Sequence, residues 1–182
     1  MIFHDTRVKG AYLIDIRPVE DDRGFFARTW AVEEAEARGL VGSFTQCSLA
    51  RNTTAGTLRG LHYQTGVHVE TKLIRCTRGR IYDVVLDLRP DSETFARWDA
   101  VELSAANRRS IYIPRGCAHG YLTLEDDSEV AYQITPAYCA EASAGVRWND
   151  PMFGIEWPAA PSVISDRDRS FPNFGTVHAT RG

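Results

Sequence analysis

Short stretches that alternate apolar and polar residues recur about every ten residues along this chain, a spacing typical of strands joined by turns. The predicted strands are 11–19, 24–30, 44–50, 58–64, 71–77, 80–88, 95–103, 110–113, 120–124 and 128–135. One stretch, residues 31–38, consists of good helix formers and ends at Gly39. Because this helix does not recur, alternating βαβ units are disfavoured, and the pattern predicts an all-β sandwich or small barrel. A tight hairpin is expected at residues 77–80.

The size and charge of the chain restrict the classes of function. Its 182 residues fit one domain, 1–182, and its net charge of −3 provides no general basic field for nucleic acid. No apolar run reaches the length of about 20 residues that spans a membrane, and the first residues do not resemble a signal peptide. The cysteines, at 47, 76, 117 and 139, match no zinc or redox spacing. We therefore expect a cytoplasmic protein with reduced thiols.

The segment Arg59-Gly60-Leu61-His62-Tyr63-Gln64 places a histidine and an arginine in one predicted strand. A neutral histidine in an apolar barrel can act as a general base, although it can equally be a core residue that only makes a hydrogen bond. Arg59 can bind a phosphate through two parallel hydrogen bonds. Positions 59 and 62 point to opposite faces of a regular strand, so both reach one pocket only if the strand bulges near Gly60 or Arg59 lies at the rim.

Two further positions attract attention. The segment 114–120, with the spacing Pro-x-Gly-x-x-His, resembles the second motif of the cupin proteins and predicts a turn that brings His119 to the mouth of a barrel. Lys72 shares strand parity with Ile74 and Cys76, which look core-facing. A lysine on an inward face is costly unless it meets an anion, and otherwise it extends to water from the end of the strand.

Tyr132 and Asp168 carry little signal in isolation. Tyr132 lies between Val130 and Ile134 on one strand face, where a tyrosine usually serves packing. Asp168 stands in a polar segment near the end of the chain, where a solvated charge is the simplest interpretation.

Several blocks in fixed order nevertheless resemble one family, that of the dTDP-4-dehydrorhamnose 3,5-epimerases. The matching blocks are 22–26 (DRGFF), 56–64 (GTLRGLHYQ), 72–75 (KLIR), 82–89 (YDVVLDLR), 113–120 (IPRGCAHG), 148–151 (WNDP) and 164–168 (ISDRD). The resemblance implies a cupin barrel, that is, a double-stranded β-helix or jelly roll, with short helices and a C-terminal segment that closes the site. It also implies a homodimer without metal or cofactor that inverts C3 and C5 of a nucleotide-diphosphate 4-keto-6-deoxysugar.

The resemblance assigns roles to residues that match the family pattern. His62 matches the base, Asp168 the aspartate that orients it, Tyr132 the acid on the opposite face of the sugar, and Lys72 the lysine near the ketone oxygen. The expected substrate contacts are Arg23, Phe26, Gln46, Ser48, Arg59, His119 and Tyr138. Two positions depart from the family: Arg28 stands in place of a glutamate and Ser48 in place of an asparagine, so the nucleobase stays open.

Alternatives remain from other classes. A metal-dependent cupin dioxygenase or isomerase would need a second histidine where Gln64 stands, and His68 and Glu70 are poorly spaced to replace it. A non-catalytic sugar-binding cupin would not need the complete set of proposed catalytic residues. A mono-epimerase, or a relative acting on a GDP- or CDP-linked sugar, is compatible with the same residues.

Overall fold

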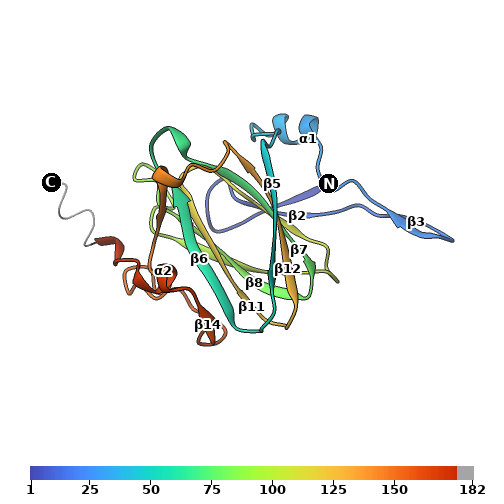
Figure 1. Cartoon of the computed structure of the whole chain (residues 1–182). Helices are drawn as coiled ribbons and strands as arrows, with labels where there is room; N and C mark the ends of the chain where they lie inside the picture. The colour runs from blue at the N-terminus through green and yellow to red at the C-terminus, as the bar shows by residue number, and fades with distance from the viewer. Residues whose placement is uncertain (176–182) are drawn as a thin grey trace.

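The structure is a computed structural model that describes residues 1–175, and most of it consists of two facing sheets (Figure 1). The first sheet has the order β1 (Ile2–Asp5), β2 (Tyr12–Asp15), β10 (Ser110–Ile113), β7 (Thr71–Arg78), β12 (Ser128–Thr135) and β5 (Gln46–Asn52). The second has the order β13 (Ser143–Gly145), β6 (Thr57–Gln64), β11 (Cys117–Thr123), β8 (Arg80–Asp87) and β9 (Trp98–Ser104), with β14 (Val163–Ile164) parallel to β6. The helical segments are short: α1 (Val32–Glu36), α2 (Asp166–Ser170), η1 (Gly66–His68) and η2 (Ala140–Ala142). The all-β prediction is confirmed.

The chain repeatedly crosses from one sheet to the other, and this corrects the hairpin predicted at residues 77–80. β7 pairs with β10 and β12, whereas β8 pairs with β9 and β11. Gly79, with φ of 71°, turns the chain between the sheets, and a Cβ there would lie 2.4 Å from the Ser128 hydroxyl oxygen. The turn was recognisable from the sequence; the hairpin was wrong because both edges of β7 are taken by strands distant in sequence.

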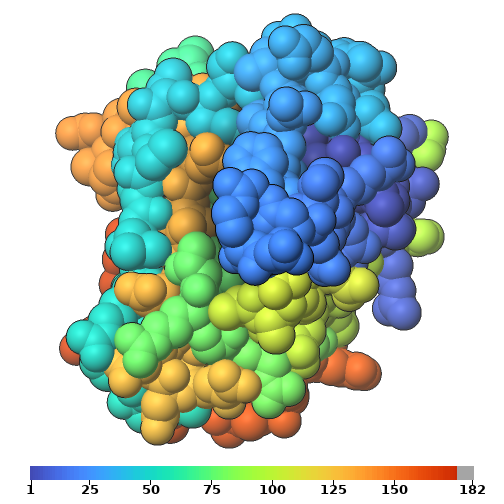
Figure 2. Space-filling view, turned by 90° about the vertical axis from the view of Figure 1, so that its right-hand side faces the viewer, coloured from blue at the N-terminus to red at the C-terminus, as the bar shows by residue number. Residues whose placement is uncertain are grey.

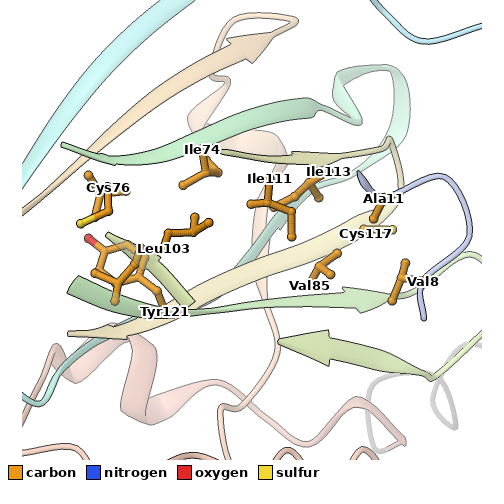
Figure 3. Close-up of a cluster of buried hydrophobic side chains, with 12 residues drawn as sticks. Val8, Ala11, Ile74, Cys76, Val85, Leu103, Ile111, Ile113, Cys117 and Tyr121 are labelled. Atoms are coloured by element: carbon orange, nitrogen blue, oxygen red, sulfur yellow. The ribbon is translucent and has the colours of Figure 1, made fainter. Parts of the chain in front are cut away.

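The space between the sheets is filled by apolar side chains from both (Figure 3). Ile74 and Cys76 of β7 lie in this core, as strand parity predicts, and face Leu103 and Tyr121 of the second sheet. Lys72, two residues before Ile74, is therefore directed inward as well, and it is buried. Core packing thus fixes which face of β7 carries the lysine.

The N-terminal arm differs from the rest of the molecule. β3 (Val19–Asp21) pairs with β4 (Gly24–Phe26) and with no other strand of the described chain. The strands predicted at 11–19 and 24–30 are both shorter in the structure, where β2 ends at Asp15 and β4 ends at Phe26. Val19 and Phe26 are 71% and 78% exposed. The arm stands away from the barrel in Figure 1 and points toward the viewer in Figure 2. Among residues 1–175, no helix is long and apolar enough to cross a membrane.

Candidate active site

A cavity of about 280 Å³ opens between the two sheets, and most of the predicted site residues line it. Its lining includes Ser48, Arg59, His62, Gln64, Glu70, Lys72, His119, Tyr121, Tyr132, Tyr138 and Arg167. A larger hollow of about 650 Å³ shares Tyr63 and Gln64 with it, but its lining includes neither His62 nor Tyr132. The smaller cavity is therefore the candidate active site, because the groups able to move protons converge there.

A bulge in β6 lets Arg59 and His62 face the same cavity. In the register of β6 and β11, His62 pairs with His119 and Arg59 pairs with Tyr121, so three steps on β6 match two on β11. Gly60 lies within this bulge at φ of 134°, where a Cβ would come within 2.5 Å of the Gly120 Cα. A side chain larger than that of glycine would collide with β11, which explains why the bulge contains glycine. Of the two alternatives that strand parity allowed, a bulge near Gly60 or Arg59 at the rim, the structure has the bulge.

His62 and Asp168 form a close pair. The Nε2 atom of His62 lies 2.7 Å from Oδ1 of Asp168, and the backbone N–H of Gly60 donates to Oδ2 at 3.1 Å. Burial acts to raise the pKa of Asp168. The interaction with His62 and the hydrogen bond from the Gly60 N–H outweigh burial and hold this pKa below its ordinary value. An ionised Asp168 accepts the Nε2 proton, which leaves Nδ1 of His62 as the basic nitrogen.

The C-terminal segment delivers Asp168 to this pair. The hydroxyl of Ser165 caps α2 by accepting the Asp168 N–H at 3.1 Å. β14 pairs with β6 just before this helix, so α2 is anchored beside the strand that carries His62. Asp168 is 4% exposed, and the interpretation of it as a solvated charge is therefore wrong.

Lys72 meets an anion inside the barrel. Its ammonium lies 2.9 Å from the Glu70 carboxylate and donates to the backbone carbonyl oxygen of His62 at 3.2 Å. Gln64 donates to the same carboxylate at 2.9 Å and accepts the backbone N–H of Cys139 at 2.7 Å. A lysine held inside the barrel by a carboxylate is placed to stabilise negative charge that develops on a bound molecule.

His119 is held by a second buried carboxylate. Its Nε2 lies 2.8 Å from Oδ2 of Asp83, and both residues are buried. Burial raises the pKa of Asp83, while the adjacent His119 acts to lower it. The sequence predicted that a turn brings His119 to the mouth of the barrel; in the structure His119 instead lies within β11, buried, and lines the cavity.

Tyr132 reaches the cavity from β12, on the sheet opposite His62. Its ring packs edge-on against His119, with centroids 6.1 Å apart. Burial raises the pKa of Tyr132 well above its ordinary value, and a hydrogen bond to Tyr121 acts in the same direction. The phenol is therefore neutral and carries a proton that it can donate.

The remaining predicted contacts divide into two groups. Tyr138 and Ser48 line the cavity, and Gln46 joins them at the rim, accepting the Tyr138 N–H at 3.0 Å and donating to the Ser48 hydroxyl at 3.4 Å. Arg23 and Phe26 are on the exposed arm and are not among the residues lining the cavity.

Sequence reasoning missed several residues of this cavity. These are Glu70, Asp83 and Asn52, which hold charged or polar groups of the site, and Tyr121 and Arg167, which line the cavity. Asp83 and Arg167 fall within the blocks of the family resemblance, and Tyr121 directly follows one of them, which was the available signal. Among residues 1–175, no group of three or more His, Cys, Asp or Glu side chains is placed to hold a metal ion.

Comparison with known proteins identifies similar chains. The family model described as dTDP-4-dehydrorhamnose 3,5-epimerase matches residues 5–176. The dTDP-4-dehydrorhamnose 3,5-epimerase of Escherichia coli strain K12 is 39% identical over 160 residues, which cover 87% of this chain and 86% of that protein.

Two solved structures extend the comparison to bound ligands. The Bacillus anthracis dTDP-4-dehydrorhamnose 3,5-epimerase with TDP and PPi bound has a TM-score of 0.90 and 40% identity, covering 95% of this chain and 99% of that one. ChmJ, a 3'-monoepimerase from Streptomyces bikiniensis in complex with dTDP-quinovose, has a TM-score of 0.89 and 30% identity, covering 98% and 90%.

Proposed function

The chain belongs to the dTDP-4-dehydrorhamnose 3,5-epimerase family, and we propose that its cavity inverts C3 and C5 of a dTDP-linked 4-keto-6-deoxysugar through an enolate. The protein is an isomerase. One observation carries the assignment of the site: His62 from the second sheet and Tyr132 from the first line the same cavity, with Lys72 in its lining as well. Inversion needs a base and an acid on opposite faces of the sugar ring, and two facing sheets provide these two sides.

Proton abstraction falls to His62. A carbon beside a ketone is acidic because the electron pair left on it delocalises into an enolate. Nδ1 of His62 takes the proton, and Asp168 stabilises the resulting imidazolium through its bond to Nε2. The electrons of the broken C–H bond move onto the C4 oxygen.

Lys72 and His119 then stabilise the enolate oxygen. Both line the cavity, and each is fixed by a buried carboxylate, Lys72 by Glu70 and His119 by Asp83. Fixed groups of this kind need little reorganisation when charge develops, which is the basis of electrostatic catalysis.

Tyr132 completes the inversion. It gives its phenolic proton to the face of the enolate that is remote from His62, the C4 carbonyl re-forms, and Tyr132 is left as a phenolate. Its high pKa keeps the proton in place until a strongly basic carbon is present.

Binding of the nucleotide involves residues at the cavity rim and, in our proposal, a second copy of the chain. Arg59 and Arg167 provide positive charge in the cavity for the diphosphate, and Tyr138, 53% exposed, provides a stacking surface. Arg23 and Phe26 lie on the exposed arm, so they contact substrate only if a partner presents them. β5 is an edge strand of the first sheet, and its Ser48 lines the cavity, which makes this edge a suitable place for the partner's arm.

The proposal also concerns the organisation and location of the chain. We treat residues 1–182 as one domain, because α2 completes the site that the barrel begins. A cytoplasmic location fits the free thiols of Cys47 and Cys139, which are accessible enough to be oxidised outside a reducing compartment.

The test is solvent deuterium exchange, followed by NMR in deuterated buffer with dTDP-, GDP- and CDP-linked 4-keto-6-deoxysugars. We expect exchange and inversion at C3 and C5 with the dTDP sugar, because the proposed base His62 and the proposed acid Tyr132 line the cavity from opposite sheets. Exchange with the GDP or CDP sugar alone would contradict the nucleotide assignment. The absence of exchange with all three sugars would contradict the enolate mechanism.

A mono-epimerase is the second candidate, favoured by the similarity to ChmJ, which is a 3'-monoepimerase. The same groups serve one carbon or two, and small differences in acid placement decide which carbon is inverted. Exchange confined to C3 in the same experiment would select this activity.

A further inference from the structure

A second buried tyrosine lies beside the proposed acid. Tyr121 is on β11 of the second sheet and is 1% exposed, with its ring in the core cluster of Figure 3. It nevertheless lines the cavity together with Tyr132, which comes from β12 of the opposite sheet. Both rings pack against His119, with ring centroids 6.2 Å and 6.1 Å from that of His119. Burial raises the pKa of Tyr132, and the nearby Tyr121 phenol acts in the same direction.

The hydroxyl of Tyr121 is hydrogen-bonded to one residue, the buried Asn52. The amide nitrogen of Asn52 donates to the Tyr121 hydroxyl oxygen at 3.2 Å, and the Tyr121 hydroxyl donates to the Asn52 oxygen at a long 3.4 Å. That Asn52 oxygen also accepts from Nε of Arg59 at 2.8 Å. The hydroxyl proton of Tyr121 therefore makes only a long hydrogen bond to the Asn52 oxygen, and that oxygen keeps its hydrogen bond from Arg59 if the proton turns away. A hydroxyl proton rotates readily.

We propose that Tyr121 is a positioning residue for Tyr132, and that its hydroxyl turns from Asn52 to Tyr132 when Tyr132 gives up its proton. In the resting protein Tyr132 donates to Tyr121. During turnover the Tyr132 proton forms the new C–H bond with the enolate electron pair, the enolate oxygen returns to a carbonyl, and a phenolate remains. Tyr121 then donates to that phenolate, which water reprotonates when product leaves.

Tyr121 favours proton donation by Tyr132 because its hydrogen bond to the Tyr132 phenolate is stronger than the hydrogen bond between the two neutral phenols. A bond to an ionised oxygen is about twice as strong as one between neutral groups, so Tyr121 stabilises the phenolate more than it stabilises the resting phenol. It thereby lowers the barrier to proton donation by acting through Tyr132.

Asn52 extends this arrangement to the phosphate end of the cavity. It bonds Arg59 through its oxygen and Tyr121 through its nitrogen, and that nitrogen also donates to the Ser128 carbonyl at 3.2 Å. The arginine proposed to hold the diphosphate and the acid pair are therefore fixed relative to one another through a single buried amide.

The experiment compares two rates in deuterated buffer with dTDP-4-keto-6-deoxyglucose: deuterium incorporation with retained configuration, and inversion. Deuterium returned on the His62 side reports proton abstraction, and inversion reports the Tyr132 side. In Tyr121→Phe we expect incorporation within about twofold of the unmodified protein and inversion about tenfold slower. A merely structural role would lower both rates together.

The matched control is Tyr112→Phe. Tyr112 is also buried, and its hydroxyl accepts the Val41 N–H at 3.0 Å, but it does not line the cavity. We expect it to lower the melting temperature as much as Tyr121→Phe does and to leave the ratio of inversion to incorporation unchanged. If Tyr121→Phe folds poorly, Asn52→Ser removes the anchor of the hydroxyl while keeping the ring, and we expect the ratio to fall about threefold.

This inference rests on the proposed role of Tyr132 as the acid, so Tyr132→Phe is measured in parallel. A lowered ratio in Tyr132→Phe beside an unchanged ratio in folded Tyr121→Phe or Asn52→Ser would overturn the Tyr121 inference alone. An unchanged ratio in Tyr132→Phe would overturn the acid assignment and the Tyr121 inference with it.

Discussion

An aspartate followed two residues later by an arginine occurs twice in this chain in the same geometry. Asp21 in the arm and Asp87 at the end of β8 each accept the backbone N–H and the guanidinium of the arginine two positions on. Asp87 is buried and accepts hydroxyl protons from Ser92 and Thr94 in addition, whereas Asp21 is exposed. The pKa of Asp87 is lowered to about 2, and that of Asp21 is lowered as well.

The difference shows how the two regions are built. In the barrel, each basic side chain proposed for proton transfer or enolate stabilisation has a buried carboxylate partner in the same chain. The pairs are His62 with Asp168, Lys72 with Glu70 and His119 with Asp83. In the arm, Arg23 is 89% exposed and pairs only with its sequence neighbour Asp21 among the described residues. The groups proposed for catalysis thus find their partners within one chain, whereas the arm presents an exposed charge and exposed apolar side chains.

The strongest test of this division changes the barrel and leaves the arm intact. In His62→Asn the side chain can still hydrogen-bond Asp168 but cannot take a proton, so we expect turnover to fall by about a thousandfold or more. NMR would follow deuterium exchange and inversion together, and circular dichroism would check that the fold survives. Exchange at an unaltered rate would show that another group is the base.

The Lys72 and Glu70 pair allows catalysis to be separated from stability. Lys72→Met leaves Glu70 buried without its cation, so we expect a loss of about 3 kcal/mol in the free energy of unfolding and about a hundredfold in rate. In the double variant Lys72→Met with Glu70→Gln, the charge is gone and most of the stability should return, while the rate should not. Guanidinium denaturation and the NMR assay measure the two quantities. Recovery of rate in the double variant would contradict the role of the ammonium.

The local sequence pattern was sufficient to predict many of the strands of the barrel. The strands 110–113 and 128–135 have the predicted bounds, because their alternation is regular and bounded by turn residues. Parity correctly placed Lys72 on the face of Ile74 and Cys76. It also allowed two ways for Arg59 and His62 to reach one pocket, and the bulge at Gly60 is the one that the structure has.

The local pattern could not predict which side chains meet in the cavity. Asp83 and Asn52 have the pattern of ordinary strand residues, and their importance comes from His119 and Tyr121, 36 and 69 positions further along the chain. Glu70 precedes β7, and its importance comes from the inward direction of Lys72. An N-terminal strand arm was expected, but its separation from both large sheets could not be foreseen, because a short strand that pairs only with its neighbour has the same sequence signals as one that joins a sheet.

The two aspartates offer a direct comparison of stability. We expect Asp87→Asn to lower the free energy of unfolding at pH 7 by about 2 kcal/mol, and Asp21→Asn to leave the unfolding midpoint unchanged. Because the folded pKa of Asp87 is depressed to about 2 from an ordinary 3.8, its contribution is fully present above pH 3.8. It is lost as the pH falls toward 2, so the difference between Asp87→Asn and the unmodified protein should shrink there. Equal effects of the two substitutions at pH 7 would contradict the contrast.

The smallest effect is expected from substitutions in the arm, which test whether the arm binds substrate. In Arg23→Ala with Phe26→Ala we expect KM for the dTDP sugar to rise about tenfold and kcat to stay within about twofold, since these residues bind but do not react. Mixing this variant with His62→Asn then distinguishes whose cavity the arm serves. If it serves the partner's, a mixed dimer has one site with both an intact His62 and an intact arm, so activity at low substrate concentration rises severalfold after subunit exchange. If activity does not rise after subunit exchange has been demonstrated, each arm serves its own barrel or no cavity at all. That result would contradict the proposal that the arm serves the cavity of a partner.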